Sequence, residues 1–85
     1  MIIKTPANET LLIVRVTHDF IGEFGLPDKN NVMDHPLRTD ELIYCKDIQE
    51  KDGGSHFLLT GIATDMGEVD LILCPDDFER VGKPS

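Results

Sequence analysis

The feature that most constrains this chain is a pair of alternating apolar runs in residues 56–81, HFLLTGIATDMGEVDLILCPDDFERV. Neighbouring side chains of a strand point to opposite faces, so runs of this kind predict β-strands. In the first run the alternation assigns two sets to opposite faces: Phe57, Leu59, Gly61 and Ala63 against Leu58, Thr60 and Ile62. In the second run one face carries Val69, Leu71 and Leu73, and the turn between the runs is Asp65, Met66 and Gly67. We therefore predict a central β-hairpin, against which the rest of the chain packs.

The hairpin is expected to end at Pro75, because proline lacks a backbone donor for the sheet. Acidic residues follow at once, and Gly82 comes six residues after Asp76. Acids favour the start of a helical segment and glycine its end. Residues 76–81 are therefore predicted to form a short helical turn before a final segment.

Two further apolar runs predict strands. Residues 10–16 are apolar on both faces and rich in β-branched side chains, residues 41–49 alternate, and Ile2 with Ile3 suggests one more short strand. The glycine-rich residues 51–55 predict a tight connection with positive φ angles. Between the two runs, residues 17–39 lose the pattern and predict a long irregular loop. Its apolar side chains are expected to fold back on the core: Phe20, Ile21, Phe24, Leu26, Val32, Met33 and Leu37.

Length and charge limit the function classes. A chain of 85 residues supports one modest core, since it buries only about 60% of the surface that its unfolded form exposes. We expect one domain over residues 1–85, with its core in 10–81 and a loose tail at 83–85. The formal net charge of −8 disfavours binding to nucleic acid and to anionic membranes, and favours a basic protein partner. No run is apolar over the ~18 residues that span a bilayer, and no secretory signal is evident, so a cytoplasmic location is expected.

No pattern in the sequence predicts a cofactor, a metal site or catalysis. The three histidines and two cysteines, Cys45 and Cys74, form no close pair such as CxxC or HxxxH, which zinc sites usually contain. Both cysteines lie in apolar strand contexts, where a thiol behaves as a small hydrophobic side chain and stays unpaired. Gly53 and Gly54 connect two strands and do not open a helix, so they do not predict a phosphate loop.

Several short sequence motifs, in the order in which they occur, resemble those of an SH3 domain. Residues 16–20, VTHDF, are similar to the family's ALYDY, and residues 40–44, DELIY, to its DELSF. Asp47 and Ile48 are similar to part of the family's GDI, and residues 75–78, PDDF, to its PSNY corner. In the family a short helical turn at this corner precedes the last strand, which the resemblance places here at residues 79–81. The resemblance covers residues 11–81 and implies an all-β fold, a small SH3-like barrel of about five strands. Two departures are a longer first loop and the absence of tryptophan, which in the family opens the third strand.

The resemblance implies a non-catalytic domain that binds a peptide or a folded protein between the long loop and the PDDF corner. His18 and Phe20 match family tyrosines, Pro75 its proline and Phe78 its tyrosine, and the missing tryptophan disfavours a proline-rich ligand. The candidate binding residues are His18, Asp19, Phe20, Glu23, Pro75, Asp76, Asp77 and Phe78. Phe20 and Phe78 have a second interpretation as core residues.

Two other functions remain open at this level. One is a small acidic inhibitor, of the phage or immunity type, that imitates nucleic acid and blocks a nucleic-acid-binding enzyme. The other is an accessory subunit of an enzyme. Residues 65–79 contain six acidic residues and no Lys or Arg. These acids form either a solvated surface of the hairpin or a binding face.

Overall fold

The computed structural model describes residues 1–6, 11–26 and 31–81 of the chain. In this part the protein is all-β, as predicted, with eight strands where about five were expected. The strands are β1 (Leu12–Val16), β2 (Phe20–Leu26), β3 (Asn31–Leu37), β4 (Leu42–Cys45), β5 (Asp47–Lys51), β6 (His56–Thr64), β7 (Gly67–Leu73) and β8 (Phe78–Val81). Two 3-10 turns join strands within these described residues: η2 (Asp52–Gly54) before β6 and η3 (Pro75–Asp77) before β8.

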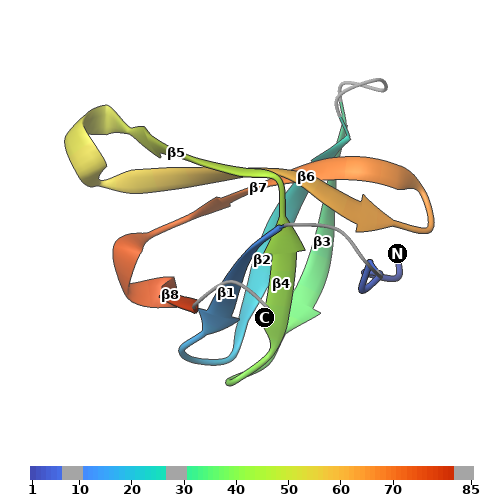
Figure 1. Ribbon diagram of the computed structural model, residues 1–85, viewed down its shortest axis with the longest axis horizontal. Helices are drawn as coiled ribbons and strands as arrows, with labels where there is room; N and C mark the ends of the chain where they lie inside the picture. Colours follow the sequence, from blue (N-terminus) through green and yellow to red (C-terminus); the bar gives the residue numbers. More distant parts are fainter. Residues whose placement is uncertain (7–10, 27–30, 82–85) are drawn as a thin grey trace.

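The strands form two antiparallel sheets (Figure 1). One sheet has the order β4-β1-β8, and the other has the order β3-β2-β7-β6-β5. Only Lys46 separates β4 from β5, and its backbone N–H donates to the Thr60 carbonyl oxygen at 2.8 Å. The chain therefore passes from one sheet to the other at Lys46. In the described residues the strands remain two sheets and do not close into one continuous ladder, which a closed barrel would require.

The predicted central hairpin is β6 and β7, but its simple alternation is wrong beyond Gly61. The pairing register shifts between Leu59 and Ile62, where Gly61 takes a φ of +73°. An extra residue of this kind is a β-bulge, and it changes which face the following side chains occupy. Leu59 and Ile62, assigned to opposite faces by the sequence pattern, are therefore both fully buried. The prediction for β7 is confirmed, since Val69, Leu71 and Leu73 are all buried.

The predicted irregular loop is instead a second hairpin, made of β2 and β3. The alternation of β2 is not visible in the sequence because one of its buried positions is Gly22, which adds no apolar side chain. A Cβ at Gly22 would lie 2.9 Å from a Leu37 side-chain carbon, so a larger residue there would displace buried neighbours. Pro36 is tolerated because β3 is the edge strand of its sheet. The expectation that its apolar side chains fold back on the core is confirmed for Phe24, Leu26 and Leu37, which are buried. It is wrong for Ile21 and Val32, whose side chains lie on the outer face of the sheet and are mostly exposed.

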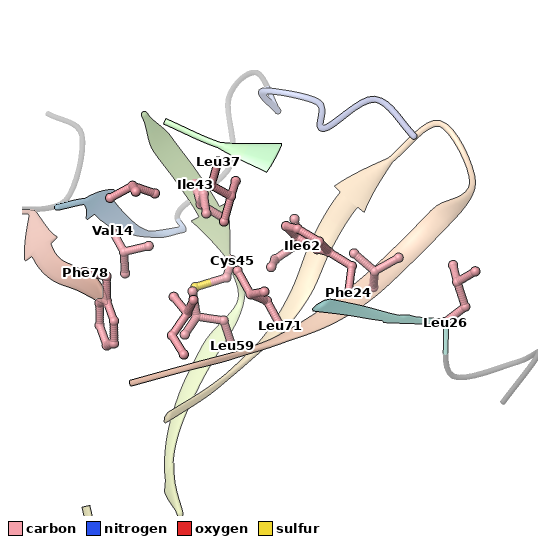
Figure 2. Packing of buried hydrophobic residues seen from close by; sticks show 13 residues of the cluster. Val14, Phe24, Leu26, Leu37, Ile43, Cys45, Leu59, Ile62, Leu71 and Phe78 are labelled. Carbon is pink, nitrogen blue, oxygen red and sulfur yellow. The ribbon is translucent and has the colours of Figure 1, made fainter. Parts of the chain in front are cut away.

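The core lies between the two sheets and draws on both (Figure 2). Every strand except β5 supplies at least one buried side chain, and β5 packs Ile48 against the cluster. The cluster consists of Val14, Val16, Phe24, Leu26, Leu37, Ile43, Cys45, Leu59, Ile62, Val69, Leu71, Leu73 and Phe78. The burial of these residues stabilises the fold by about 1.5–3 kcal/mol for each large aliphatic side chain.

Three expectations about the ends of elements need correction or fall outside the described part. The helical turn predicted over residues 76–81 is η3, which ends at Asp77. Residues 78–81 form strand β8, which includes the last strand that the resemblance implied at residues 79–81. At the start of the chain, the described residues contain a single bridge, Ile3 to Thr64, in place of a strand. Residue 10, predicted to begin a strand, and the predicted tail 83–85 lie outside the described residues.

Candidate functional site

The segment after β1 and the turn before β8 lie side by side, as expected for the long loop and the PDDF corner. The backbone N–H of Thr17 donates to the Asp77 carbonyl oxygen at 3.0 Å, and the Thr17 hydroxyl donates to the Asp76 carbonyl oxygen. Strand pairing sets up this contact, since β1 and β8 are neighbours with Val16 opposite Phe78. We call the group Thr17, His18, Asp19, Pro75, Asp76 and Asp77 the corner cluster.

Asp77 links the turn to the segment after β1. One carboxylate oxygen accepts a hydrogen bond from the Cys74 backbone N–H at 3.0 Å, which closes the 3-10 turn from within. The other oxygen, Oδ1, lies 2.7 Å from Nε2 of His18. Pro75 begins the turn, where its missing donor costs no hydrogen bond. The result is a hydrogen-bonded turn in which one carboxylate contacts two segments of the chain.

Both ring nitrogens of His18 face groups that can only accept hydrogen bonds. Nε2 faces the Asp77 carboxylate, and Nδ1 lies 3.3 Å from the backbone carbonyl oxygen of Asp19. A neutral imidazole can donate from one nitrogen only, whereas the imidazolium donates from both. The hydrogen bond with Asp77 is the main reason that the pKa of His18 is raised above its ordinary value of 6.5.

Asp19 anchors the corner cluster to the start of the β3–β4 connection. Its Oδ1 accepts hydrogen bonds from the backbone N–H of Thr39 at 2.7 Å and from the Thr39 hydroxyl at 2.9 Å. These two bonds favour the ionised carboxylate and lower the pKa of Asp19. The side chain thus serves a structural contact while remaining exposed.

An open hollow of about 280 Å³ adjoins the corner cluster. Its lining combines apolar side chains with one charge of each sign: Asp19, Phe20, Ile21, Pro36, Leu37 and Arg38. The Phe20 ring lies 5.2 Å from the His18 ring, between centroids, and so borders both features. Ile21 is 64% exposed, which is high for a large aliphatic residue. The corner cluster and this hollow together form the candidate binding surface.

Two of the eight predicted binding residues do not belong to this surface. Phe78 is only 7% exposed and packs edge-on against Phe57 with ring centroids 5.5 Å apart, so its core interpretation is the one supported. Glu23 lines a different hollow, with Gly25, Val32 and Asp70 among its neighbours. His18, Asp19, Pro75 and Asp76 are exposed, and Phe20 and Asp77 are half-buried.

Sequence reasoning missed Thr17, Thr39, Ile21 and Pro36. Thr17 and Thr39 are important for the hydrogen bonds that they make to partners 59 and 20 residues away. Ile21 and Pro36 are opposite each other on paired strands, in a region where no strands were predicted. A prediction of the second hairpin would have identified the last two, and no local pattern identifies the threonines.

The acids of residues 65–79 are distributed among different partners. Asp65 accepts a hydrogen bond from the Ile2 backbone N–H at 2.7 Å, Glu68 pairs with Lys46, and Glu79 pairs with Arg15. Asp77 contacts His18, as described above. The run therefore does not present one continuous row of unpaired carboxylates.

The two thiols occupy different environments, which corrects the expectation that both are small core side chains. Cys45 is buried in the core, and burial raises its pKa to about 11, so it is neutral at physiological pH. Cys74 is exposed at the start of η3. In residues 1–6, 11–26 and 31–81, no group of three or more His, Cys, Asp or Glu side chains is arranged to hold a metal ion.

Comparisons with protein-family models, with curated proteins and with solved structures found no match to this chain. Among the described residues there is also no helix with the length and apolar character needed to cross a membrane.

Proposed function

We propose that this chain is a non-catalytic protein-binding domain with SH3-like organisation, and that it binds a basic peptide or folded protein at the corner cluster and the adjoining hollow. One observation carries the proposal: two segments 59 residues apart are hydrogen-bonded into a surface that leaves Ile21, Pro36 and Asp76 exposed. These are the two regions through which SH3 domains bind their ligands, by the resemblance of residues 16–20 and 75–78.

The order of pairing supports the SH3-like part of the proposal. The first strand, β1, lies between β4 and the last strand β8, and the chain passes through Lys46 into the meander β5, β6, β7. A 3-10 turn precedes the last strand, as the PDDF resemblance implies. The hairpin β2–β3 stands where the family has its first long loop.

The charge of the surface supports a basic partner. Asp19 and Asp76 are exposed there, and the chain has a net charge of −8. A cationic partner would approach faster and bind more tightly at low ionic strength, because salt screens such attraction over about 8 Å at physiological concentration. An affinity that is equal at low and high salt would contradict this part of the proposal.

Affinity purification from the native host with mass spectrometry identifies the partner, and calorimetric titration with surface variants then tests the site. Ile21→Ser removes an exposed apolar contact beside the hollow and is expected to raise the Kd about fivefold or more. Met66→Ser is the matched control, since Met66 is 42% exposed in the β6–β7 turn. Equal losses in the two variants, or none in Ile21→Ser, would refute the proposed surface.

The partner's identity separates this proposal from its alternatives. A nuclease or polymerase bound through its basic groove would favour the acidic inhibitor, and a stoichiometric enzyme complex would favour the accessory subunit. The distribution of the acids of residues 65–79 among separate ion pairs weighs against the inhibitor, because a mimic of nucleic acid needs a row of free charges.

A further inference from the structure

The outer face of the five-stranded sheet carries exposed aliphatic side chains beside two hollows. Ile72 is 59% exposed and Val32 is 58% exposed, although both lie in strands. One hollow, of about 230 Å³, is lined by Glu23, Gly25, Val32, Leu58, Asp70 and Ile72. The other, of about 370 Å³, is lined by Lys51, Asp52, His56, Leu58 and Ile72. Because both hollows share Leu58 and Ile72, we treat them as one groove, the sheet-face groove.

Strand register explains why these residues meet. Leu58 lies opposite Ile72 on the β6–β7 pair, while their neighbours Leu59 and Leu71 point into the core and are fully buried. Gly25 lies opposite Asp70 on one side and opposite Val32 on the other. A Cβ at Gly25 would come no closer than 3.9 Å to other atoms, so this position is an open part of the groove floor.

Two carboxylates in the groove have no partner within the described residues. Neither Glu23 nor Asp70 makes a hydrogen bond or an ion pair there, in contrast to Glu68 and Glu79. Glu23 also lies directly opposite a third acid, Asp34, on the β2–β3 pair. Like charges opposite each other on paired strands destabilise a sheet, and a bound cation would relieve the repulsion.

We propose that the sheet-face groove binds a basic segment of a partner protein, with an Arg or Lys head group between Glu23 and Asp70. The aliphatic stem of such a side chain suits the surface of Ile72, and an apolar neighbour in the segment covers Leu58. A second copy of this chain is a poor occupant, because two domains of net charge −8 repel each other. This surface is separate from the corner cluster, so the inference goes beyond the proposed function.

The probe is a capped six-residue peptide of alternating arginine and valine, titrated into the 15N-labelled protein and followed by amide NMR spectra. We expect the largest shifts at Gly25, Leu58, Asp70 and Ile72. The double variant Glu23→Gln with Asp70→Asn is expected to weaken binding about fivefold or more, and so is Ile72→Ser. The same peptide with glutamate in place of arginine is expected not to bind.

Glu50→Gln is the matched control, because Glu50 lies opposite Phe57 and so faces away from Leu58 on the same sheet. It removes one charge without touching the groove, and the dispersion of the amide spectrum shows that each variant is folded. An equal loss of affinity in Glu50→Gln, or no detectable binding, would overturn the inference. Shifts confined to residues 17–21 and 75–77 would also overturn it, while they would support the corner cluster as the binding surface.

Discussion

Nε2 of His18 lies 2.7 Å from Oδ1 of Asp77, although 59 residues separate the two in the chain. The contact joins the segment leaving β1 to the turn that enters β8. Asp77 also accepts a hydrogen bond from the Cys74 backbone N–H, so one carboxylate contacts both His18 and the turn. The candidate binding surface therefore contains one titratable contact, between the His18 imidazole and the Asp77 carboxylate.

We expect the contact between His18 and Asp77 to be stronger at pH 6 than at pH 8. A pKa raised by folding means that the protonated form stabilises the folded state. That stabilisation is fully present below the pKa of His18 in the unfolded chain, about 6.5, and is lost as the pH rises through the pKa of His18 in the folded protein. NMR titration of the His18 ring measures the shift. In Asp77→Asn the pKa of His18 should fall, and a pKa unchanged by this substitution would contradict the assigned cause.

Gly61→Ala should destabilise the protein by about 1–3 kcal/mol, because the bulge holds this residue in a left-handed conformation. The added Cβ would lie 2.7 Å from side-chain carbons of Lys46, which adds a steric conflict where the chain changes sheets. Urea unfolding measures the loss. Gly25→Ala is the control, since its added Cβ has room, and its effect is expected to stay within about 1 kcal/mol. Equal stabilities of the two variants would contradict the prediction.

Phe78→Ala should cost about 3–5 kcal/mol of the free energy of unfolding, because it removes a buried ring from the core. Phe20→Ala should cost less, about 1–2 kcal/mol, since Phe20 is half-buried at the edge of the cluster. Thermal and chemical unfolding check both. If Phe78→Ala leaves the protein as stable as the wild type, the core assignment is wrong.

One thiol should react rapidly with Ellman's reagent in the folded protein, and the second only after unfolding. Cys74 is exposed, whereas Cys45 is buried with a pKa of about 11 and is both shielded and neutral. Cys74→Ser should abolish the fast phase and leave the slow one. Two equally fast thiols in the native protein would show that the core around Cys45 opens readily.

The sequence predicts elements best where one strand has one buried face and one exposed face. In β7 the alternating apolar residues Val69, Leu71 and Leu73 are the ones that are buried. Prediction from the alternation fails in β2, where Gly22 is buried but contributes no apolar side chain to the pattern. It also fails beyond Gly61, because a bulge changes the periodicity and leaves no trace in hydropathy.

The candidate site was predictable in part for a similar reason. Residues 16–20 and 75–78 could be identified as short motifs, and the resemblance of these motifs to SH3 domains predicted that they lie close together. Which of their side chains are exposed could not be inferred, since Phe20 and Phe78 are the same residue type in similar contexts. The packing of Phe57 against Phe78 decides the question, and the two are 21 positions apart.

By itself the sequence determined the all-β class, the strong strands, the glycine-rich turns and the acidic charge, because these depend on local side-chain pattern and composition. Only the tertiary structure decided that β2 and β3 pair as a hairpin, that Asp19 accepts hydrogen bonds from Thr39, and that Glu23 and Asp70 line the same groove. Each of these contacts depends on which strands become neighbours. That choice is a property of the whole chain, since a strand buries its apolar face only against partners supplied by distant segments.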